Sequence, residues 1–213
     1  MTSDQTEMLP GTNRDKEASQ WFTPPELAER VVEWARVAKA VQGIPRPIRV
    51  LEPSAGNGAL VRPLVAAGAC VEAVEADLRY VSDLANVLGL GERAHRMHCP
   101  CDFLKQRPDP RFDLVVTNPP YEHGQDVAFI LHALKFAPRV VGIFRSALLH
   151  GKERKHALWQ HVRLTRIAFL SERPKFGKGD KADSARSDFI VAELVERERW
   201  RAGEIERVAM EWW

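Results

Sequence analysis

The chain has 213 residues, with 45% hydrophobic side chains, 28% charged side chains and a formal net charge of +2. This length suits one folded domain with a sizeable core. The first twenty residues are polar and no later segment approaches roughly 18 apolar residues, so the sequence predicts neither a signal peptide nor a membrane span. Three cysteines, Cys70, Cys99 and Cys101, are too sparse and odd in number for a disulfide framework. We therefore expect a soluble protein of the cytoplasm.

The charge is unevenly distributed along the chain. Residues 145–186 hold eleven Lys and Arg against four Asp and Glu, a net of +7, which leaves −5 for the remainder. A basic segment on an acidic body is typical of proteins that bind a polyanion. An ordinary solvated, charged face has the same pattern, and charge alone does not choose between the two.

The first predicted element is a helix over residues 24–39. Thr23 and Glu26 have the spacing of a capping box around two prolines, and apolar side chains follow at helical spacing from Leu27 to Trp34. The helix should therefore begin at Pro24, with the hydroxyl of Thr23 as its cap.

Seven later segments are short, rich in β-branched residues and bounded by turn residues, as strands are. They cover residues 48–51, 70–75, 95–98, 112–117, 139–144, 164–170 and 189–195. Helical patterns separate most of them, which predicts an α/β fold with a doubly wound, mostly parallel sheet. Ligands of such folds bind at the carboxyl ends of the strands.

The first strand runs into a glycine-rich turn, Glu52-Pro53-Ser54-Ala55-Gly56-Asn57-Gly58, and then a helix. Glycine at 56 and 58 permits a positive φ and removes Cβ atoms where a ligand would lie against the main chain. A plain tight turn has the same signature, so the motif alone does not decide.

Acidic side chains follow the second and third strands. Glu75 comes about twenty residues after the glycine turn, where a carboxylate can accept hydrogen bonds from both hydroxyls of a ribose. Asp77 is the better candidate for a helix cap. After the third strand, the Asp102 carboxylate can take an adenine amine while Phe103 packs against the ring.

A zinc site is the alternative for this region, because His95, His98, Cys99 and Cys101 are close in sequence. Structural zinc normally needs ligand pairs from two separated places, and the sequence holds no second pair. We expect no metal.

The strand at 112–117 leads directly into Asn118-Pro119-Pro120-Tyr121. Two consecutive prolines cannot donate backbone hydrogen bonds, so they end the strand and leave a stiff loop. This loop holds an amide side chain and an aromatic ring at the edge of the sheet. Such a pair can receive a planar amine and stack on it, which predicts methyl transfer to nitrogen.

The order and spacing of these motifs resemble the class I S-adenosylmethionine-dependent methyltransferases over residues 20–145, specifically the adenine-N6 DNA methyltransferases with an NPPY motif. Gln20-Trp21-Phe22-Thr23-Pro24 resembles the motif that precedes the glycine loop in the TaqI-like subgroup. The resemblance implies a Rossmann-like, seven-stranded sheet whose last strand is antiparallel. It also implies S-adenosyl-L-methionine as cofactor and adenine N6 in DNA as the methylated group.

The resemblance further assigns roles to residues. It implies that the cofactor is bound by Thr23, Glu52, Pro53, Ala55, Gly56, Gly58, Glu75, Asp102, Phe103 and Asn118, and that the catalytic motif is Asn118, Pro119, Pro120 and Tyr121. By this analogy the Asn118 amide oxygen and the Pro119 carbonyl accept the two N–H bonds of the target amine. Tyr121 stacks on the flipped base, the alternative being an aromatic lid that packs on its own loop. Thr23 contacts the methionine end of the cofactor as well as capping its helix.

We expect a flexible segment over residues 1–19, a single catalytic domain over 20–213 and a mobile loop at 172–187 that contacts substrate. The basic residues expected at a nucleic acid are Arg145, Lys152, Arg173, Lys175, Lys178 and Lys181. The tail at Trp212-Trp213 packs either on the body or on a second protomer, and the oligomeric state is left open.

The same motif occurs in methyltransferases that act on RNA adenines and on glutamine amides of proteins, so both substrates are alternatives to DNA. The glutamine substrate is less favoured because the late basic stretch suits phosphates. A module that binds the cofactor without turnover is the non-enzymatic alternative.

Overall fold

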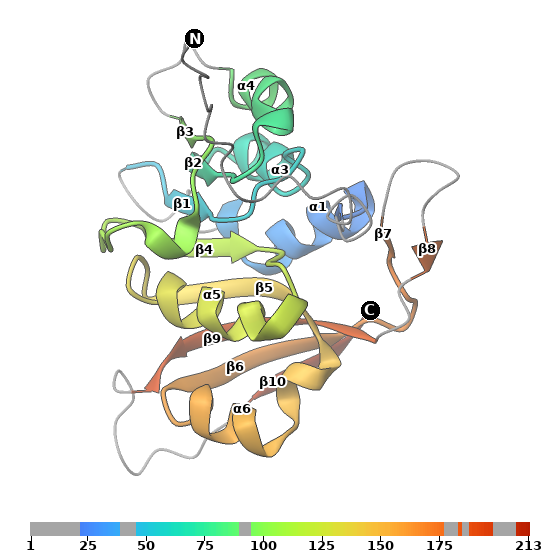
Figure 1. The fold of residues 1–213 in the computed structure, drawn as a ribbon. Coiled ribbons are helices and arrows are strands. Elements are labelled where there is room, and N and C mark those ends of the chain that lie inside the picture. The colour runs from blue at the N-terminus through green and yellow to red at the C-terminus, as the bar shows by residue number, and fades with distance from the viewer. Residues whose placement is uncertain (1–21, 39–45, 90–94, 177–182, 185–187, 198–207) are drawn as a thin grey trace, which may run out of the picture.

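The structure is a computed structural model that describes residues 22–38, 46–89, 95–176, 183–184, 188–197 and 208–213. In this part of the chain a central sheet lies between two layers of helices (Figure 1). The expected flexible segment at 1–19, residues Gln20 and Trp21, and the basic residues Lys178 and Lys181 lie outside the described residues.

The strands of the central sheet are β1 (Arg49–Glu52), β2 (Cys70–Val74), β3 (Arg96–His98), β4 (Leu114–Thr117), β5 (Arg139–Arg145), β6 (Val162–Phe169), β9 (Phe189–Glu196) and β10 (Ala209–Trp212). A separate two-stranded sheet consists of β7 (Lys175–Phe176) and β8 (Asp183–Ser184). The α-helices are α1 (Pro25–Trp34), α3 (Val61–Ala66), α4 (Val81–Leu88), α5 (Gln125–Ala133) and α6 (Lys152–Ala157). Short 3-10 turns are η2 (Leu78–Tyr80), η3 (Phe103–Lys105), η4 (Glu122–Gly124) and η5 (Ser146–Leu149).

The strand order across the central sheet is β10-β6-β9-β5-β4-β1-β2-β3. Neighbouring strands are parallel except at β9, which is antiparallel to both β5 and β6. All seven predicted strands are present, and the mostly parallel sheet with an antiparallel strand at 189–195 is confirmed. The sheet has one strand more than predicted, because the aromatic tail pairs as β10 with β6.

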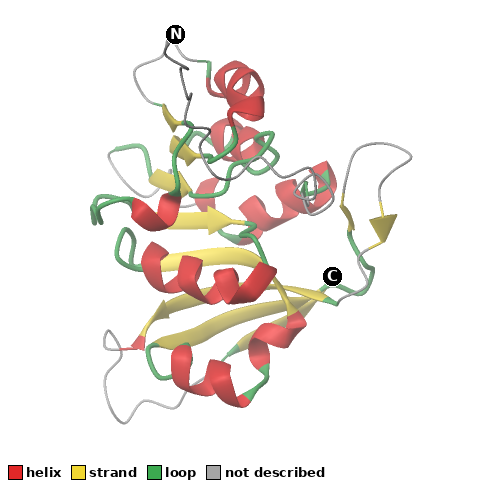
Figure 2. Ribbon diagram, in the orientation of Figure 1, coloured by secondary structure: helices red, strands yellow, loops and turns green. Residues whose placement is uncertain are grey.

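The two faces of the sheet bury separate hydrophobic cores, and Figure 2 shows helices on both sides. Helices α1, α3 and α4 cover one face, where Val116 of β4 is buried. Helix α5 and the residues around α6 cover the other face, where Val115 is buried. Alternation of consecutive residues between two covered faces explains why the strands read as nearly continuous apolar runs.

The carboxyl ends of the parallel strands lie at one rim of the sheet. Thr117 at the end of β4 pairs with Gly142 of β5, so Asn118 leaves the sheet at this rim. The same rim holds the end of β1 at Glu52 and the end of β2, after which Glu75 follows. The topology therefore brings the glycine turn, the acid of the second strand and the Asn118 loop together.

The tail packs on the body of its own chain. Trp213 lies edge-on against Trp34 of α1, with ring centroids 5.9 Å apart, and the Arg30 guanidinium lies 4.5 Å from the Trp213 ring. The backbone N–H of Trp213 donates to the backbone carbonyl of Phe169 (2.8 Å). Trp213 therefore packs within its own chain, while Trp212 is exposed. None of the described helices has the length and apolar character needed to cross a membrane.

Candidate active site

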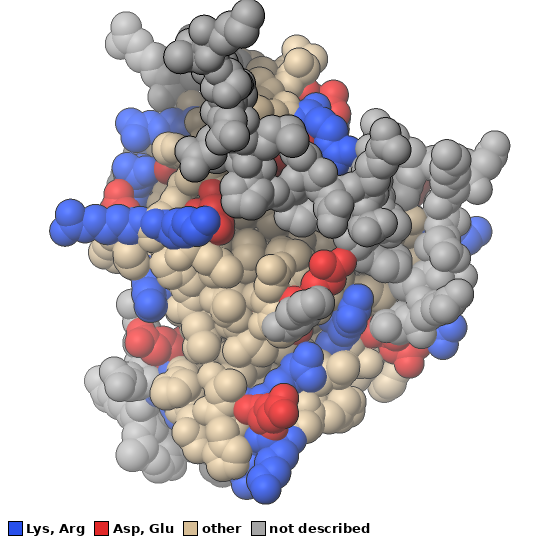
Figure 3. All heavy atoms as spheres, viewed as in Figure 1, with Lys and Arg blue, Asp and Glu red and all other residues tan. Residues whose placement is uncertain are grey.

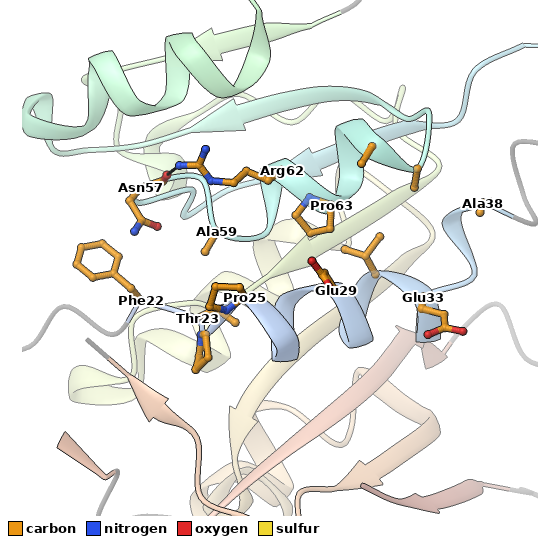
Figure 4. Close-up of a pocket in the computed structure, with 14 residues that line it drawn as sticks. Phe22, Thr23, Pro25, Glu29, Glu33, Ala38, Asn57, Ala59, Arg62 and Pro63 are labelled. Carbon is orange, nitrogen blue, oxygen red and sulfur yellow. Dashed lines mark hydrogen bonds between the residues drawn. The ribbon is translucent and has the colours of Figure 1, made fainter. Parts of the chain in front are cut away.

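A narrow crevice at the rim joins the glycine turn to Asn118. Its volume is about 30 Å³, and its lining includes Glu52, Gly56, Asn57, Thr23 and Asn118. A larger cavity of about 680 Å³ adjoins it between α1 and α3 and shares Thr23 and Asn57 with it. Figure 4 shows this cavity, with Arg62 reaching to the Asn57 carbonyl (3.3 Å). Of these two cavities in the described part of the chain, the crevice is the one that contains Glu52, Gly56 and Asn118 together.

The glycine turn needs its glycines. Gly56 has φ 52° and Gly58 has φ 82°, both in the left-handed region that side chains disfavour. A Cβ at Gly58 would also lie 3.2 Å from a methyl group of Val87 in α4. The Gly56 N–H points to the Glu75 carboxylate (2.6 Å). The backbone of this turn therefore requires glycine at both positions, as the glycine spacing in the sequence predicted.

Glu75 ties the glycine turn to the turn after β2. One of its oxygens accepts from the Gly56 N–H and the other from the Asp77 N–H (2.8 Å). Burial raises the pKa of Glu75, and these hydrogen bonds lower it in part. Each oxygen keeps a further lone pair, so the carboxylate can still accept from ribose hydroxyls. Asp77 caps η2 as predicted, because its side chain accepts from the Arg79 N–H (2.9 Å).

Glu52 is the most deeply buried acid of the crevice, with 1% of its surface exposed. One oxygen accepts from the Ser54 N–H and hydroxyl (both 3.0 Å), while the other has no hydrogen-bond partner among the described residues. Burial raises the pKa of Glu52 to about 8, against the opposing effect of the Ser54 hydrogen bonds. The Asn57 side-chain oxygen is likewise buried without a partner in the described part of the chain. Two residues that line one crevice thus each hold a side-chain oxygen without a partner in the described part of the chain.

Ser54 connects this turn to the Asn118 loop, a role that the sequence did not predict. Its hydroxyl lies 2.8 Å from the Thr117 hydroxyl oxygen and 3.1 Å from the Asn118 carbonyl oxygen. The sequence signal was a hydroxyl residue directly after Glu52-Pro53 in the glycine turn. Its partner was not visible, because β4 lies far along the chain.

The Asn118 amide is held from two sides. Its Nδ2 donates to the Thr23 Oγ1 (3.0 Å), and its Oδ1 accepts from the Tyr121 hydroxyl. The Tyr121 hydroxyl also lies 3.1 Å from the Ile143 carbonyl oxygen. These contacts set the amide plane, with the nitrogen toward α1 and the oxygen toward Tyr121.

Thr23 does not cap the first helix, which corrects the capping-box prediction. The N-cap residue of α1 is Pro24, and no side chain makes a capping hydrogen bond there. The helix begins one residue later than the motif implied, at Pro25, and the Thr23 hydroxyl binds Asn118 instead. The Thr23 hydroxyl therefore accepts a hydrogen bond from a residue 95 positions away instead of capping the helix that follows it.

Tyr121 is buried in this conformation, with 6% of its surface exposed. Its ring lies edge-on against Phe189 at 5.4 Å, and the Arg145 guanidinium lies 5.0 Å from its centroid. Burial raises the pKa of Tyr121, and the Arg145 charge opposes this. In this conformation the ring packs against residues of β5 and β9. Stacking on a target base stays a prediction that requires the side chain to turn outward.

Phe103 does not line the crevice, which corrects the expectation that its ring packs against a ligand. It is 2% exposed and packs against Phe129 and Phe136 beneath α5, with centroids 5.3 and 5.2 Å away. The apolar core takes the ring because it lies on the buried side of η3. Asp102 is half exposed and caps η3 by accepting from the Leu104 N–H (3.1 Å), so its adenine contact stays a prediction.

The four residues considered as zinc ligands do not converge on one point, and they have separate hydrogen-bond partners of their own. The His98 Nε2 lies 2.8 Å from a Glu72 oxygen, and the His95 Nδ1 accepts from the Val71 N–H (3.1 Å). The Cys99 thiol lies 3.4 Å from the Asp77 carbonyl oxygen. Within the described ranges, no group of three or more His, Cys, Asp or Glu could hold a metal ion.

The predicted basic contacts are dispersed. Arg145 lies over Tyr121, Lys152 begins α6, Lys175 is in β7, and Arg173 pairs with Asp188 (3.2 Å) at the surface. Figure 3 shows Lys and Arg side chains interspersed with Asp and Glu on the face that carries α5 and α6. The mobility of the predicted 172–187 loop is untested, since much of this stretch lies outside the described residues.

No protein-family model matches the chain. Among curated proteins, a mitochondrial dimethyladenosine transferase 2 from Bos taurus is 30% identical over 167 residues, which are 73% of this chain and 40% of that protein. This chain thus spans less than half of the length of that relative.

Solved structures have the same fold at low sequence identity. A candidate RNA methyltransferase from Pyrococcus horikoshii superposes with a TM-score of 0.65 at 19% identity, over 89% of this chain and 94% of that one. A type I restriction-modification methyltransferase subunit from Streptococcus thermophilus has a TM-score of 0.63 at 14% identity, over 89% and 50%. Magnesium protoporphyrin IX methyltransferase from Synechocystis, with bound S-adenosylmethionine, has a TM-score of 0.57 at 18% identity, over 80% and 78%. This chain therefore has the class I S-adenosylmethionine-dependent methyltransferase fold.

Proposed function

We propose that this protein transfers a methyl group from S-adenosylmethionine to the N6 amine of adenine in a nucleic acid, with RNA as the first candidate substrate. The observation that carries the proposal is the crevice that joins Asn118 to Glu52 and Gly56 at the rim of the sheet. A cofactor seated on the glycine turn would then lie next to the amide that receives the target amine.

The crevice residues fit the polar parts of the cofactor. Glu52 and Asn57 each hold a buried oxygen without a partner among the described residues. An ammonium group would donate to both oxygens, and its positive charge would favour the ionised form of Glu52, whose pKa burial raises to about 8. Glu75 stands at the end of β2, where it would accept from the ribose hydroxyls. Asp102 follows β3 and would accept the adenine amine. When bound, S-adenosylmethionine supplies a methyl group activated by the positive charge on sulfur.

The Asn118 loop would bind and orient the target amine. Its lone pair is delocalised into the adenine ring, so acceptors at its N–H bonds make more electron density available at nitrogen. The Asn118 Oδ1 would accept one N–H and the Pro119 carbonyl the other, which is catalysis by positioning and fixed dipoles. In the structure the Asn118 Oδ1 already accepts a hydrogen bond from the Tyr121 hydroxyl. Target entry would therefore displace Tyr121, whose ring would be free to stack on the base.

The names of the relatives favour RNA over DNA. The curated relative is a dimethyladenosine transferase, and the structure with the TM-score of 0.65 is a candidate RNA methyltransferase. DNA is the second candidate, because a restriction-modification methyltransferase subunit matches the same share of this chain and the NPPY motif resembles the DNA enzymes.

The test offers unmodified RNA transcripts and unmethylated genomic DNA separately to the protein with methyl-labelled cofactor, followed by digestion to nucleosides. Label in N6-methyladenosine from RNA supports the first candidate, and label in N6-methyldeoxyadenosine alone supports DNA. A third reaction offers a protein extract, and label in its glutamine side chains with none in RNA or DNA would assign the site to glutamine amides and refute the proposal.

Asn118→Ala distinguishes an enzyme from a binding module. Methyl transfer should fall to background in this variant, while the dissociation constant for the cofactor changes little, since the amide acts on the target amine. A wild-type protein that binds the cofactor but labels neither RNA nor DNA would instead be a module without turnover.

A further inference from the structure

An exposed aromatic pair lies at the edge of the central sheet. The rings of Phe169 in β6 and Trp212 in β10 stack with centroids 4.6 Å apart and planes at 24°. Trp212 is 74% exposed, so solvent reaches the indole although Phe169 covers one side of it. An indole this exposed in a stacked arrangement has an apolar surface that its own chain leaves uncovered. We call Phe169 and Trp212 the aromatic platform.

The register of the sheet puts the aromatic platform on the same rim as Asn118. Thr117, Gly142 and Met210 lie in one row across the sheet, joined through pairings in β9 and β6. Trp212 lies two residues beyond Met210, at the level of Pro119 in the loop after β4. Four strand spacings separate β4 from β10, a distance of roughly 19 Å.

Basic residues follow Phe169 of the aromatic platform closely along the chain. The chain that leaves β6 is tied to the tail, because the Ser171 N–H donates to the Trp213 carbonyl (2.6 Å). Arg173 and Lys175 follow within four residues and are exposed. Arg173 pairs with Asp188, but both side chains are solvated, and such a pair contributes little and exchanges readily. Cations beside an open aromatic face are the usual pairing for single-stranded nucleic acid.

We propose that the aromatic platform stacks on an unpaired base of the nucleic acid whose adenine enters at Asn118. This inference rests on the proposed function and adds the part of the substrate that it would hold, a nucleotide away from the target. Tyr121 and Phe189 are buried at the catalytic loop, whereas Trp212 offers an open ring on the same rim. A stacked base needs one π-face with adjacent positive charge, and both are present.

A second copy of this chain is the other conceivable occupant, but the surface suits it less well. The large apolar side chains exposed in this part of the described chain are Val208, Met210 and Trp212, within one four-residue edge strand and the residue before it. A stable protein interface needs a broader area, of the order of 800 Å² on each partner.

The test measures binding of a fluorescently labelled, unstructured RNA oligonucleotide and its DNA counterpart by anisotropy, with wild type, Trp212→Ala, Trp212→Phe and Met210→Ala. Met210 is the matched control, since it is exposed to a similar degree (69%) on the same face of β10 but lies two residues further from the rim. Trp212→Ala should weaken binding by about five-fold to 150-fold. Trp212→Phe should retain most of the affinity, and Met210→Ala should bind as wild type.

Abasic substitutions scanned along the oligonucleotide give the second readout. Wild type should lose affinity when the stacked base is removed, and Trp212→Ala should be insensitive to that same removal. Equal affinities of wild type and Trp212→Ala, or equal losses in Trp212→Ala and Met210→Ala, would overturn the inference. So would a smaller assembly of Trp212→Ala than of wild type in sedimentation, because a second copy would then cover the surface.

The outcome is separable from that of the proposed function. If wild type methylates adenine and Trp212→Ala binds the oligonucleotide as tightly as wild type, the base-stacking role of the aromatic platform is refuted and the proposed function is not. Base-dependent binding through Trp212 by a protein that transfers no methyl group supports the platform and refutes the methyltransferase activity.

Discussion

At the residue scale, the Asn118 amide owes its orientation to Thr23, from a distant segment, and to Tyr121 of its own loop. The Thr23 hydroxyl accepts from Nδ2, which leaves Oδ1 directed to where Tyr121 now binds. An amide free to rotate would present its NH₂ group to the target amine half of the time, and two donors do not bind each other. Thr23 is therefore a positioning residue for Asn118.

Replacing Thr23 by Val tests this role. The Asn118 nitrogen loses its acceptor, a change of about 1 to 3 kcal/mol for a buried donor, which corresponds to roughly five-fold to 150-fold in kcat. Thr23→Ser keeps the hydroxyl and should retain most of the rate. Turnover and cofactor affinity are to be measured separately. A rate loss that Thr23→Ser shares in full would mean that the methyl group of Thr23 matters and not the hydrogen bond.

Glu52 makes the stability of the protein depend on pH. Its folded pKa of about 8 exceeds its ordinary value of 4.5 because it is buried, so the folded state holds a proton that the unfolded state has released. The stability associated with that proton is complete below about pH 4.5 and is lost as the pH rises through 8. Within this window the slope is at most about 1.4 kcal/mol per pH unit.

Urea denaturation of wild type and Glu52→Gln between pH 5 and 8.5 checks the slope. Wild type should lose stability as the pH rises, and the difference from Glu52→Gln should grow toward pH 8, because Gln stays neutral. Burial raises the pKa of Glu75 as well, so a smaller slope of the same sign should remain in the variant. Parallel curves for the two proteins would contradict a proton held on Glu52.

At the element scale, the glycine turn between β1 and α3 depends on backbone conformations and on contact with α4. The sequence predicted the turn and its neighbouring strand, because glycine spacing and a β-branched run are local signals. It could not predict that Gly58 abuts Val87, which belongs to a helix formed much later in the chain. The same limit applies to Phe103, whose ring joined the core beneath α5.

Gly58→Ala and Gly89→Ala separate strain from steric contact. Both glycines have a positive φ, but a Cβ at Gly89 meets nothing within 4 Å. Gly89→Ala should cost about 1 kcal/mol of stability from the backbone alone. Gly58→Ala should cost more and should also weaken cofactor binding, since the turn must shift. Calorimetry for stability and titration for the cofactor give the two values, and equal effects of the two variants would refute the role of the Val87 contact.

At the scale of the whole molecule, β10 completes the sheet and attaches the tail to α1. Trp213 packs edge-on against Trp34 on one face, whereas Trp212 projects on the other face over Phe169. Period-two alternation thus divides two adjacent tryptophans between a structural and an exposed position. The sequence did not predict this strand, because four residues carry little pattern and only pairing with β6 defines it.

Trp213→Ala should therefore destabilise the protein by about 1 to 3 kcal/mol, through lost contact with Trp34 and Arg30. Trp212→Ala should change stability by less than about 1 kcal/mol, because little of its surface is buried. Urea unfolding of the two single variants is the measurement. A larger loss from Trp212→Ala than from Trp213→Ala would show that the faces of β10 are assigned the wrong way round.

The sequence by itself determined the parts of this protein that depend on neighbours in the chain. Seven strands, the glycine turn and the proline-stiffened loop after Thr117 were all predictable, because periodicity, glycine and proline act within a few residues. Only the tertiary structure decided which atoms meet at Asn118, where the Phe103 ring lies and that the tail forms a strand. Each of these depends on a contact between segments far apart in sequence, and such contacts form only when the two faces of the sheet are packed.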